Sequence, residues 1–333
     1  MTRNNKLIID AFPVFNELDL FRFRISYLGS LVDRFVIAES NLTHSGVPKP
    51  LFVTTWLAQF DQETREKFHV LQVPLEDLKS SWEREIFTRE YLAKYLTKTF
   101  SSARFILSDL DEIPSQKQVQ TLKNKKGIFH FVTITSYRKS NWTLVDSHSN
   151  WHLGVMGEVS ELEGLPNGGR FSKLSIIDAD FGAHLSYFGC DSQTLSKKFQ
   201  ATAHTELNEN FRSDPNLLNF SDHYRVDHLG RGRSPGFGVF QVVGLGENAV
   251  IDEIRKHHPQ HFDKGNDLPS KKSRILASIW LTSYVGNGPI SKFKRYIFPP
   301  YFYFSSLLIM ILFPPMVEIT ITFILQMRRR LFL

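Results

Sequence analysis

The sequence RFILSDLDEIP, residues 104–114, places two aspartates directly after a short apolar run. We expect residues 104–107 to form a buried strand that ends in a polar turn before Pro114. In open α/β sheets, ligands bind beyond the carboxyl ends of the strands. Asp109 and Asp111, two residues apart in such a turn, can face one cation, and their oxygens suit Mn²⁺ or Mg²⁺. The stretch therefore predicts a divalent metal site at the end of a sheet strand.

On both sides of this turn, short apolar runs alternate with amphipathic stretches, as in βα units around a sheet. One helix is predicted over 18–28, with Asn16 as N-cap and Gly29 as the stop, and another over 82–96. Further strands are predicted at 7–12, 35–38, 69–73 and 128–135. This pattern predicts an α/β, Rossmann-type fold with a mostly parallel central sheet.

The second half of the chain has a less regular pattern. It contains Trp142, Trp151, a glycine-rich stretch at 164–169 and a helical pattern over 192–207. We expect residues 1–290 to form one domain, with a nucleotide-binding half at about 1–135 and an acceptor-binding half at about 136–290. Residues 291–333 are expected to form a separate tail.

Composition narrows the class of protein. The 333 residues are 42% hydrophobic and 22% charged, which predicts a globular body. The net charge of +6 is dispersed, without the basic stripe of a nucleic-acid-binding protein, so no nucleic-acid partner is expected. Cys190 is the single cysteine and cannot form an internal disulfide. Because the N-terminus also lacks a secretion-signal pattern, we expect a reducing, cytoplasmic location.

The tail has a membrane-binding character. Residues 297–325 carry Glu318 as their one charged side chain, and two Pro-Pro pairs divide them into short apolar pieces. Basic residues flank both sides, with Arg328, Arg329 and Arg330 at the end. An interfacial or re-entrant hairpin on the cytoplasmic face keeps both basic clusters beside anionic headgroups. The alternative is a soluble helical pair that covers the sheet.

The D-x-D pattern alone is weak, and a second copy, Asp178-Ala179-Asp180, follows another apolar run. The first copy, Asp109-Leu110-Asp111, is more specific because of its context: several motifs occur in one order between about Leu7 and Leu207. They are FNELDL (15–20), VDRFVI (32–37), ESNLTH (39–44), PKPL (48–51), Trp82, Arg89, SDLDEIP (108–114), GAHLSYFG (182–189) and HTE (204–206). Together they resemble glycosyltransferase family 17.

The resemblance implies a GT-A-type fold, a UDP-sugar donor with GlcNAc as the expected sugar, inversion at the anomeric carbon, and a divalent metal. Two positions depart from the family pattern. Ala183 stands where members commonly carry Trp, and Cys190 stands where Gly is common. Both lie on the expected acceptor side, so the family's acceptor is not carried over, and a glycan or lipid-linked glycan is the expected acceptor class.

Roles follow for individual residues. Asp109 and Asp111 are the expected metal ligands, and Glu39, Asn41, Arg89 and Asp109 the expected donor-binding residues. Each has an alternative that needs no ligand: Glu39 and Asn41 would be polar residues of a strand-to-loop turn, and Arg89 would form a surface ion pair with Glu85. His184 and His204 are expected to bind the acceptor.

The expected catalytic residues are Asp111, Glu112 and Glu206. An inverting transferase needs a general base, for which Glu112, Glu206 and Asp180 are candidates. Glu112 has a second possible role, which is to orient the metal ligands.

Two other functions fit parts of the sequence. A Mg²⁺ phosphohydrolase would use Asp109 as nucleophile, but such sites prefer Thr or Val where Ile113 stands. A non-catalytic membrane scaffold built on a degenerate transferase fold would not need the intact Asp109–Asp111 pair. The leading prediction is a metal-dependent, inverting glycosyltransferase that forms a β linkage.

Overall fold

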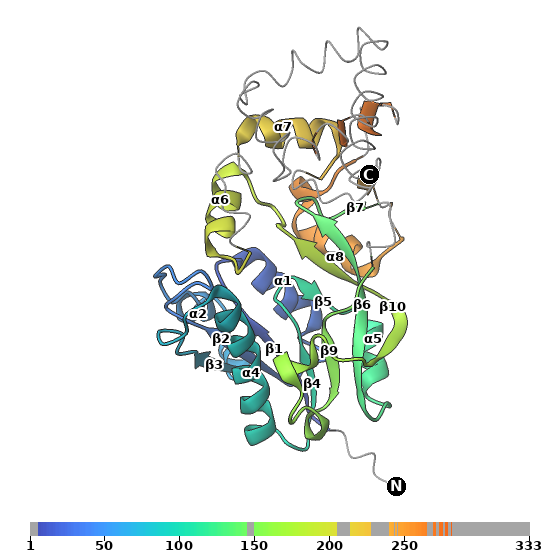
Figure 1. Cartoon of the computed structure of the whole chain (residues 1–333). Helices are drawn as coiled ribbons and strands as arrows, with labels where there is room; N and C mark the ends of the chain where they lie inside the picture. The colour runs from blue at the N-terminus through green and yellow to red at the C-terminus, as the bar shows by residue number, and fades with distance from the viewer. Residues whose placement is uncertain are drawn as a thin grey trace, which may run out of the picture. The chain divides into compact units, whose positions relative to one another are not determined.

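The computed structural model describes residues 6–144, 150–204, 214–227, 240–242, 244, 246–264, 269–270, 273–275, 277–278 and 281 (Figure 1). Its contacts divide the chain into two compact units. The first is Met1–Asn208 with Gln241–Lys264, and the second is Glu209–Phe240 with Gly265–Leu333. The predicted boundary at 290 and the tail 291–333 lie outside the described residues. Among the helices that are described, none is long and apolar enough to cross a membrane.

The first part of the chain alternates strands and helices as predicted. β4 has its predicted bounds, and β1, β2 and β3 each differ from prediction by one residue at either end. The elements are β1 (Ile8–Pro13), α1 (Leu18–Leu28), β2 (Arg34–Glu39), α2 (Val53–Leu57), α3 (Gln62–Arg65), β3 (Phe68–Gln72), α4 (Ser81–Thr99) and β4 (Arg104–Leu107).

The second part contains more strands than the sequence pattern indicates. Its elements are β5 (Glu112–Ile113), α5 (Gln116–Leu122), β6 (Ile128–Tyr137), β7 (Trp142–Leu144), β8 (Asn150–Trp151), β9 (Val155–Glu158), the 3-10 turns η2 (Val159–Glu161) and η3 (Pro166–Gly169), β10 (Ser175–Ser186), α6 (Ser192–Ala201), β11 (Phe240–Val242), α8 (Ala249–His257) and the 3-10 turn η6 (Pro259–His261). Helix α7 (Pro215–Tyr224) belongs to the second unit. The predicted helix over 192–207 ends at Ala201, where Thr202 is extended.

The sheet is mixed, and most of its pairing is parallel, as predicted: among the described strands, the parallel pairs include the long β6–β10 pair. Its main path runs β11-β7-β6-β9-β4-β1-β2-β3, with β10 beside β6 and β5. The pairs β1–β2, β1–β4 and β2–β3 are parallel. Strand β9 lies between β4 and β6 and is antiparallel to both. Short connections suffice for antiparallel neighbours, which is why this region lacks the strand–helix alternation that reads clearly in a sequence.

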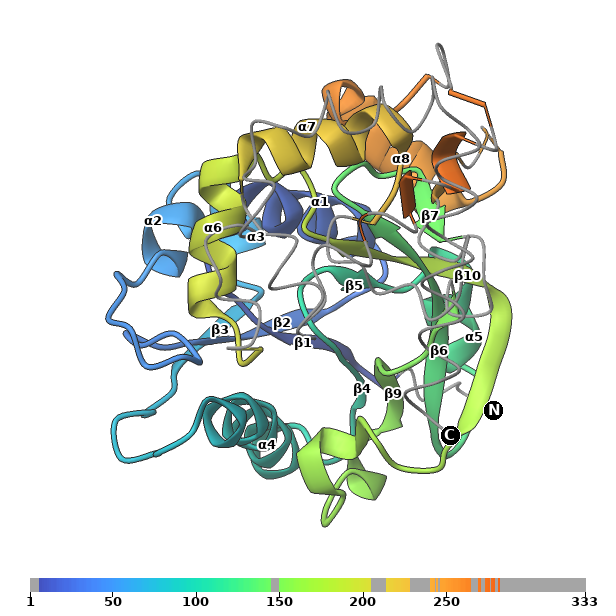
Figure 2. The same cartoon turned by 45° about the horizontal axis from the view of Figure 1, so that its top comes forward.

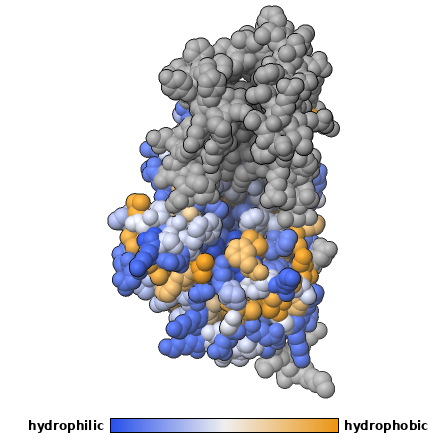
Figure 3. All heavy atoms as spheres, viewed as in Figure 1, coloured by the Kyte–Doolittle hydropathy of each residue, from blue (hydrophilic) through white to orange (hydrophobic). Residues whose placement is uncertain are grey.

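Helices cover both faces of the sheet (Figure 2). Alternate residues of β1 point to opposite faces: Ile8 and Phe12 join the core under α1, α5 and α8, whereas Ile9 and Ala11 join the core under α4. On the face shown in Figure 3, hydrophobic surface patches are separated by hydrophilic residues. The two buried clusters pack the helices against the sheet, one on each face, and so fix the positions of the strand ends.

Two helix starts differ in how they are capped. Helix α4 begins with a capping box in which the Ser80 side chain accepts from the backbone N–H of Glu83, and the Glu83 carboxylate accepts from that of Ser80. The N-cap of α1 is Glu17, not the predicted Asn16. The carboxylate of Glu17 accepts from the backbone N–H groups of Phe15 and Asn16 and pairs with Lys198, so it turns away from the helix.

Candidate functional site

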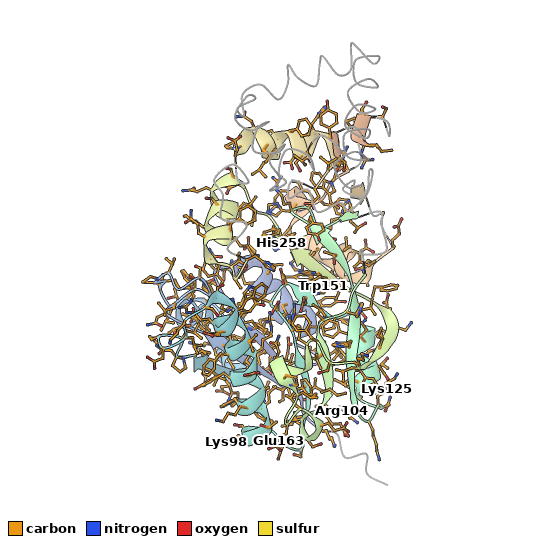
Figure 4. All side chains as sticks on the ribbon, viewed as in Figure 1. Lys98, Arg104, Lys125, Trp151, Glu163 and His258 are labelled. Atoms are coloured by element: carbon orange, nitrogen blue, oxygen red, sulfur yellow. The ribbon has the colours of Figure 1, made fainter. Side chains whose placement is uncertain are left out.

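The two predicted metal ligands lie where β4 ends, beside the ends of its parallel neighbour β1. Figure 4 shows Trp151 toward this end of the sheet, whereas Arg104, the first residue of β4, lies at the opposite end. Asp109 and Asp111 follow β4 directly, and the turn returns into the short strand β5, which pairs with β10. The loop is therefore anchored on both sides by the sheet.

A buried arginine from α1 fixes the backbone of this turn. The side chain of Arg24 is fully buried and forms a bidentate ion pair with the equally buried Asp10, at 2.6 and 2.9 Å. Its guanidinium also donates to the Ser108 hydroxyl and to the carbonyl oxygens of Asp109, Leu110 and Glu112. Five donors in a planar fork suit this task, which a lysine cannot perform. Arg24 thereby sets where the aspartate side chains project.

The carboxylate of Asp109 lies between two guanidinium groups. Arg89 Nη2 is 2.9 Å from its Oδ1, and Arg170 Nη2 is 3.0 Å from its Oδ2. Burial alone would raise the pKa of Asp109, but Arg170 and Arg89 outweigh it and hold the pKa well below its ordinary value. Arg89 also pairs with Glu85 at 2.9 Å, so the ion pair considered from the sequence and the contact with Asp109 coexist.

A left-handed turn delivers Arg170 to this position. Asn167, Gly168 and Gly169 have φ values of 51°, 62° and 82°, and the chain then enters Arg170. A Cβ on Gly168 would lie 2.5 Å from a methyl carbon of Leu107, so this turn presses against β4 and requires glycine there. The glycine-rich stretch seen in the sequence thus serves to bring a cation to the aspartate turn.

Glu112 is the third acid of the cluster and connects Arg170 to the backbone of the aspartate turn. Arg170 donates to both of its carboxylate oxygens, at 2.9 and 2.8 Å, and the indole N–H of Trp151 donates to Oε1. Glu112 Oε2 in turn accepts from the backbone N–H of Asp109. The side chain is buried, and although burial favours its neutral form, Arg170 holds its pKa below the ordinary value. This position favours the orienting role for Glu112 over that of a general base.

Asp111 has a different environment. Among the described residues, its one partner within salt-bridge distance is His184 of β10, whose Nε2 lies 3.7 Å from Oδ2. Among the residues that the structure describes, no lysine or arginine lies within salt-bridge distance of Asp111. Burial raises the pKa of Asp111, with Asp109 and Glu112 adding to the rise, and His184 and Lys198 offset it only in part. Asp111 is thus a carboxylate that a cation would stabilise.

This donor set fits a divalent cation that takes most of its ligands from outside the chain. Within the described part of the chain, no three His, Cys, Asp or Glu side chains are grouped to hold a metal by themselves. Mg²⁺-type ions commonly take one or two carboxylates and complete their shell with substrate phosphates and water. Asp111 is suited to be such a ligand, whereas Asp109 as a ligand would share its oxygens with Arg89 and Arg170.

Comparison with known proteins identifies the family. The model of Glycosyltransferase family 17 matches residues 1–218, about two thirds of the chain. The chain belongs to glycosyltransferase family 17. The resemblance seen in the sequence motifs is thereby confirmed.

Named relatives match a shorter stretch. The human protein "Beta-1,4-mannosyl-glycoprotein 4-beta-N-acetylglucosaminyltransferase" is 32% identical over 128 residues, which cover 36% of this chain and 24% of the human protein. The rat protein of the same name is 31% identical over the same shares. The match thus spans about a quarter of each relative's length. Among solved structures, HddC from Yersinia pseudotuberculosis aligns with TM-score 0.32 and 12% identity, over 55% of this chain and 91% of that one.

The family 17 motif around Glu39 has a structural role in this chain. The Glu39 carboxylate is buried and accepts from the backbone N–H groups of Phe52 and Val53, and Lys49 Nζ lies 3.6 Å away. The carbonyl of Asn41 accepts from the N–H of Lys49 at 2.8 Å. These contacts explain the conformation of loop 40–53 without a ligand, and donor binding by Glu39 and Asn41 stays a prediction.

The expected acceptor residues lie at two separate places. His184 contacts Trp151 in a tilted arrangement, with ring centroids 4.9 Å apart, next to Asp111. His204 is exposed, and its ring meets Trp82 of α4 edge to face at 4.8 Å. Glu206 lies outside the described residues. Of the expected site residues, the structure brings Asp109, Asp111, Glu112, Arg89 and His184 together.

Four charged residues at or near this candidate site were not predicted from the sequence. They are Asp10, Arg24, Arg170 and Lys198. For Arg170 a signal existed, since it directly follows the glycine-rich stretch. For Arg24 there was none, because a helical arginine predicts an exposed side chain and its partners lie far along the sequence.

Proposed function

We propose that this chain transfers a sugar, GlcNAc in our expectation, from a UDP-sugar to a hydroxyl of a glycan or lipid-linked glycan, with inversion and a β linkage. Membership of family 17 supports the class of reaction. The names of its relatives, which are N-acetylglucosaminyltransferases, support the sugar.

The proposal rests on a difference between the acids of the aspartate turn: Asp109 and Glu112 have arginine partners, and Asp111 has none among the described residues. Asp109 and Glu112 are neutralised by Arg89 and Arg170, whereas Asp111 keeps a carboxylate with a raised pKa and no lysine or arginine partner among the described residues. A site built only for stability would not leave one of these three neighbouring acids without a cationic partner. A positively charged ligand at Asp111 accounts for the arrangement.

The chain's own residues divide the work. Arg24 and Glu112 fix the backbone of the turn, and Arg89 and Arg170 hold Asp109 in place. We propose Mn²⁺ or Mg²⁺ as the cofactor; bound at Asp111, it would supply Lewis-acid stabilisation of charge on the departing diphosphate.

On the acceptor side, we propose that the rings of His184 and Trp151, which lie beside Asp111, contact the acceptor sugar. Since Arg170 and Trp151 occupy the carboxylate of Glu112, Glu206 is our proposed general base.

A donor screen tests the proposal. UDP release would be measured with Mn²⁺ across several UDP-sugars, for the full chain and for Asp111→Asn. We expect release with one or few donors, dependence on the added metal, and loss of release in Asp111→Asn. Asp180→Asn is the matched control, because Asp180 belongs to the second D-x-D copy and is exposed. No release with any donor, together with no Mn²⁺-dependent UDP binding, would favour the non-catalytic scaffold.

We further propose that residues 297–333 bind the cytoplasmic surface of a membrane, which supports a lipid-linked or surface-glycan acceptor. The support is the uncharged run 297–325 between basic clusters. Sedimentation with vesicles that contain anionic lipid would compare the full chain with a 297–333 deletion. We expect the deletion to stay in the supernatant while it still binds UDP. A deletion variant that sediments like the full chain would contradict this part of the proposal.

A further inference from the structure

Lys198 of α6 is a partly buried cation near the aspartate turn, and the proposed reaction does not yet give it a role. We propose that Lys198 binds the diphosphate of the nucleotide donor and stabilises the charge that the diphosphate gains as it leaves. The inference rests on the proposed function and adds a catalytic residue to it.

Three elements build the position of Lys198. Helix α6 begins with Asp191, whose side chain accepts from the N–H of Thr194, and it buries Leu195 and Phe199 on the side that carries Lys198. Lys198 Nζ lies 3.0 Å from Glu17 at the start of α1. It also lies 5.5 Å from the ring centre of Tyr187, just past the end of β10. The ammonium is therefore held at a defined place.

The ammonium keeps hydrogen-bonding capacity for a ligand. It has three N–H donors, and Glu17 is its one acceptor among the residues that the structure describes. The side chain is 18% exposed, so bulk water has limited access to the remaining donors. Phosphate oxygens are the acceptors that match a buried ammonium best, because they are charged and numerous.

Lys198 also lies close enough to the proposed metal site for its charge to act there. The N–H of Leu185 in β10 donates to the carbonyl of Asp111 at 2.8 Å, and Tyr187, which Lys198 contacts, follows two residues later, so the end of β10 holds both groups in one region. Burial would lower the pKa of Lys198, but Glu17 and Asp111 outweigh it and hold the pKa above its ordinary value, so the side chain stays charged at neutral pH. A diphosphate at Asp111 then meets positive charge from two sides.

The step assigned to Lys198 involves no transfer of its own proton. The bond between the anomeric carbon and the diphosphate oxygen breaks, and its electron pair stays on that oxygen. The acceptor hydroxyl forms the new bond to the anomeric carbon and gives its proton to the general base. Lys198 donates hydrogen bonds to the diphosphate as its negative charge grows, which lowers the barrier.

Glu17 provides a way to separate ligand binding from a structural role. Glu17→Gln and Lys198→Met both remove the ion pair, but only Lys198→Met removes the cation. If the pair merely holds α6, the two variants will behave alike. If Lys198 binds the diphosphate, Glu17→Gln will retain UDP affinity. Lys197 is the matched control, because it is the neighbouring lysine on α6 and is exposed.

Calorimetry of UDP, UMP and uridine with Mn²⁺ tests the inference on the full chain. For Lys198→Met we expect UDP affinity to fall by about tenfold or more, UMP affinity to fall less, and uridine affinity to stay unchanged. Lys197→Met and Glu17→Gln should stay within about threefold of wild type for UDP, and Lys198→Arg should retain part of the affinity.

Two results would overturn the inference while leaving the proposed function intact. One is wild-type UDP affinity in Lys198→Met, and the other is an equal loss in Lys198→Met and Glu17→Gln. Absence of UDP binding by the wild-type protein itself would instead remove the proposed function, and this inference with it. Thermal melts of every variant identify any that fail to fold, in which case Lys198→Arg and Glu17→Gln decide.

Discussion

The two D-x-D turns of this chain have the same sequence pattern and different surroundings. Asp109 and Asp111 follow β4 at the ends of parallel strands, and arginines or a histidine face both carboxylates. Asp180 lies in the irregular part of β10, between the register positions of Ile177 and Gly182, and is exposed. Its φ is 70°, and its carboxylate accepts from the next backbone N–H at 2.9 Å. The position of a motif in the sheet, and not the motif itself, makes a site.

The largest difference between the two turns is expected in the UDP-release activity of Asp111→Asn and Asp180→Asn. Asp111→Asn should reduce UDP release by about 10²–10³-fold, because the carboxylate that would hold the cation is lost. Asp180→Asn should stay within about twofold, since its carboxylate caps only its own turn. Initial rates with saturating Mn²⁺ measure both. Equal losses in the two variants would contradict the distinction.

Stability should depend strongly on Arg170. Arg170→Met leaves Glu112 buried without its cation and should lower the free energy of unfolding by about 3–5 kcal/mol. Arg65→Met, at an exposed arginine of α3, should change it by no more than about 0.5 kcal/mol. Urea unfolding followed by circular dichroism measures both. If Arg170→Met lowered the free energy of unfolding as little as Arg65→Met does, the ion pairs of Arg170 would not contribute to stability.

Within the first turn, the two aspartates should have opposite effects on stability. Asp109→Asn removes a charge that two arginines stabilise and should cost about 1–3 kcal/mol. Asp111 has a raised pKa, so the folded state binds its proton more tightly than the unfolded chain, and the charged form destabilises the fold at neutral pH. Asp111→Asn should therefore raise the melting temperature at pH 7 without metal. A decrease would show that Asp111 already has a compensating partner.

Acid should weaken the protein through the same cluster. The pKa values of Asp109 and Glu112 are lowered on folding, so their contribution is present above their ordinary values of 3.8 and 4.5 and is lost as pH falls below them. Melting temperatures of wild type and Asp180→Asn should therefore fall together below about pH 4.5. Asp109→Asn should show a shallower fall. Identical slopes in all three proteins would remove Asp109 from the acid transition.

The sequence predicted the parts of this molecule that depend on local pattern. Strand β4, the aspartate turn after it and helix α4 are encoded by apolar runs, a turn and a capping box. The β4 turn was also predicted to be the site because ligands bind at such strand ends. Strand β10 was missed, because its polar interior and its register shift break the alternation that marks a strand.

The charged cluster could not be predicted, because its contacts are non-local. Arg24 binds carbonyl groups more than 80 residues further along the chain, and Arg170 reaches Glu112 across 58 residues. Which of several acids faces a cation depends on how these arginines are shared. From the sequence, Asp109 and Asp111 were both expected to bind the metal, whereas the structure shows that they have different partners.

The central claim is that Asp111 holds a divalent cation where β4 ends. Electron paramagnetic resonance of Mn²⁺, titrated with the protein in the presence of UDP, tests it most directly. We expect loss of the free Mn²⁺ signal with wild type and Asp180→Asn, and no loss with Asp111→Asn. If Asp111→Asn removed the free Mn²⁺ signal as completely as wild type does, this claim would be contradicted.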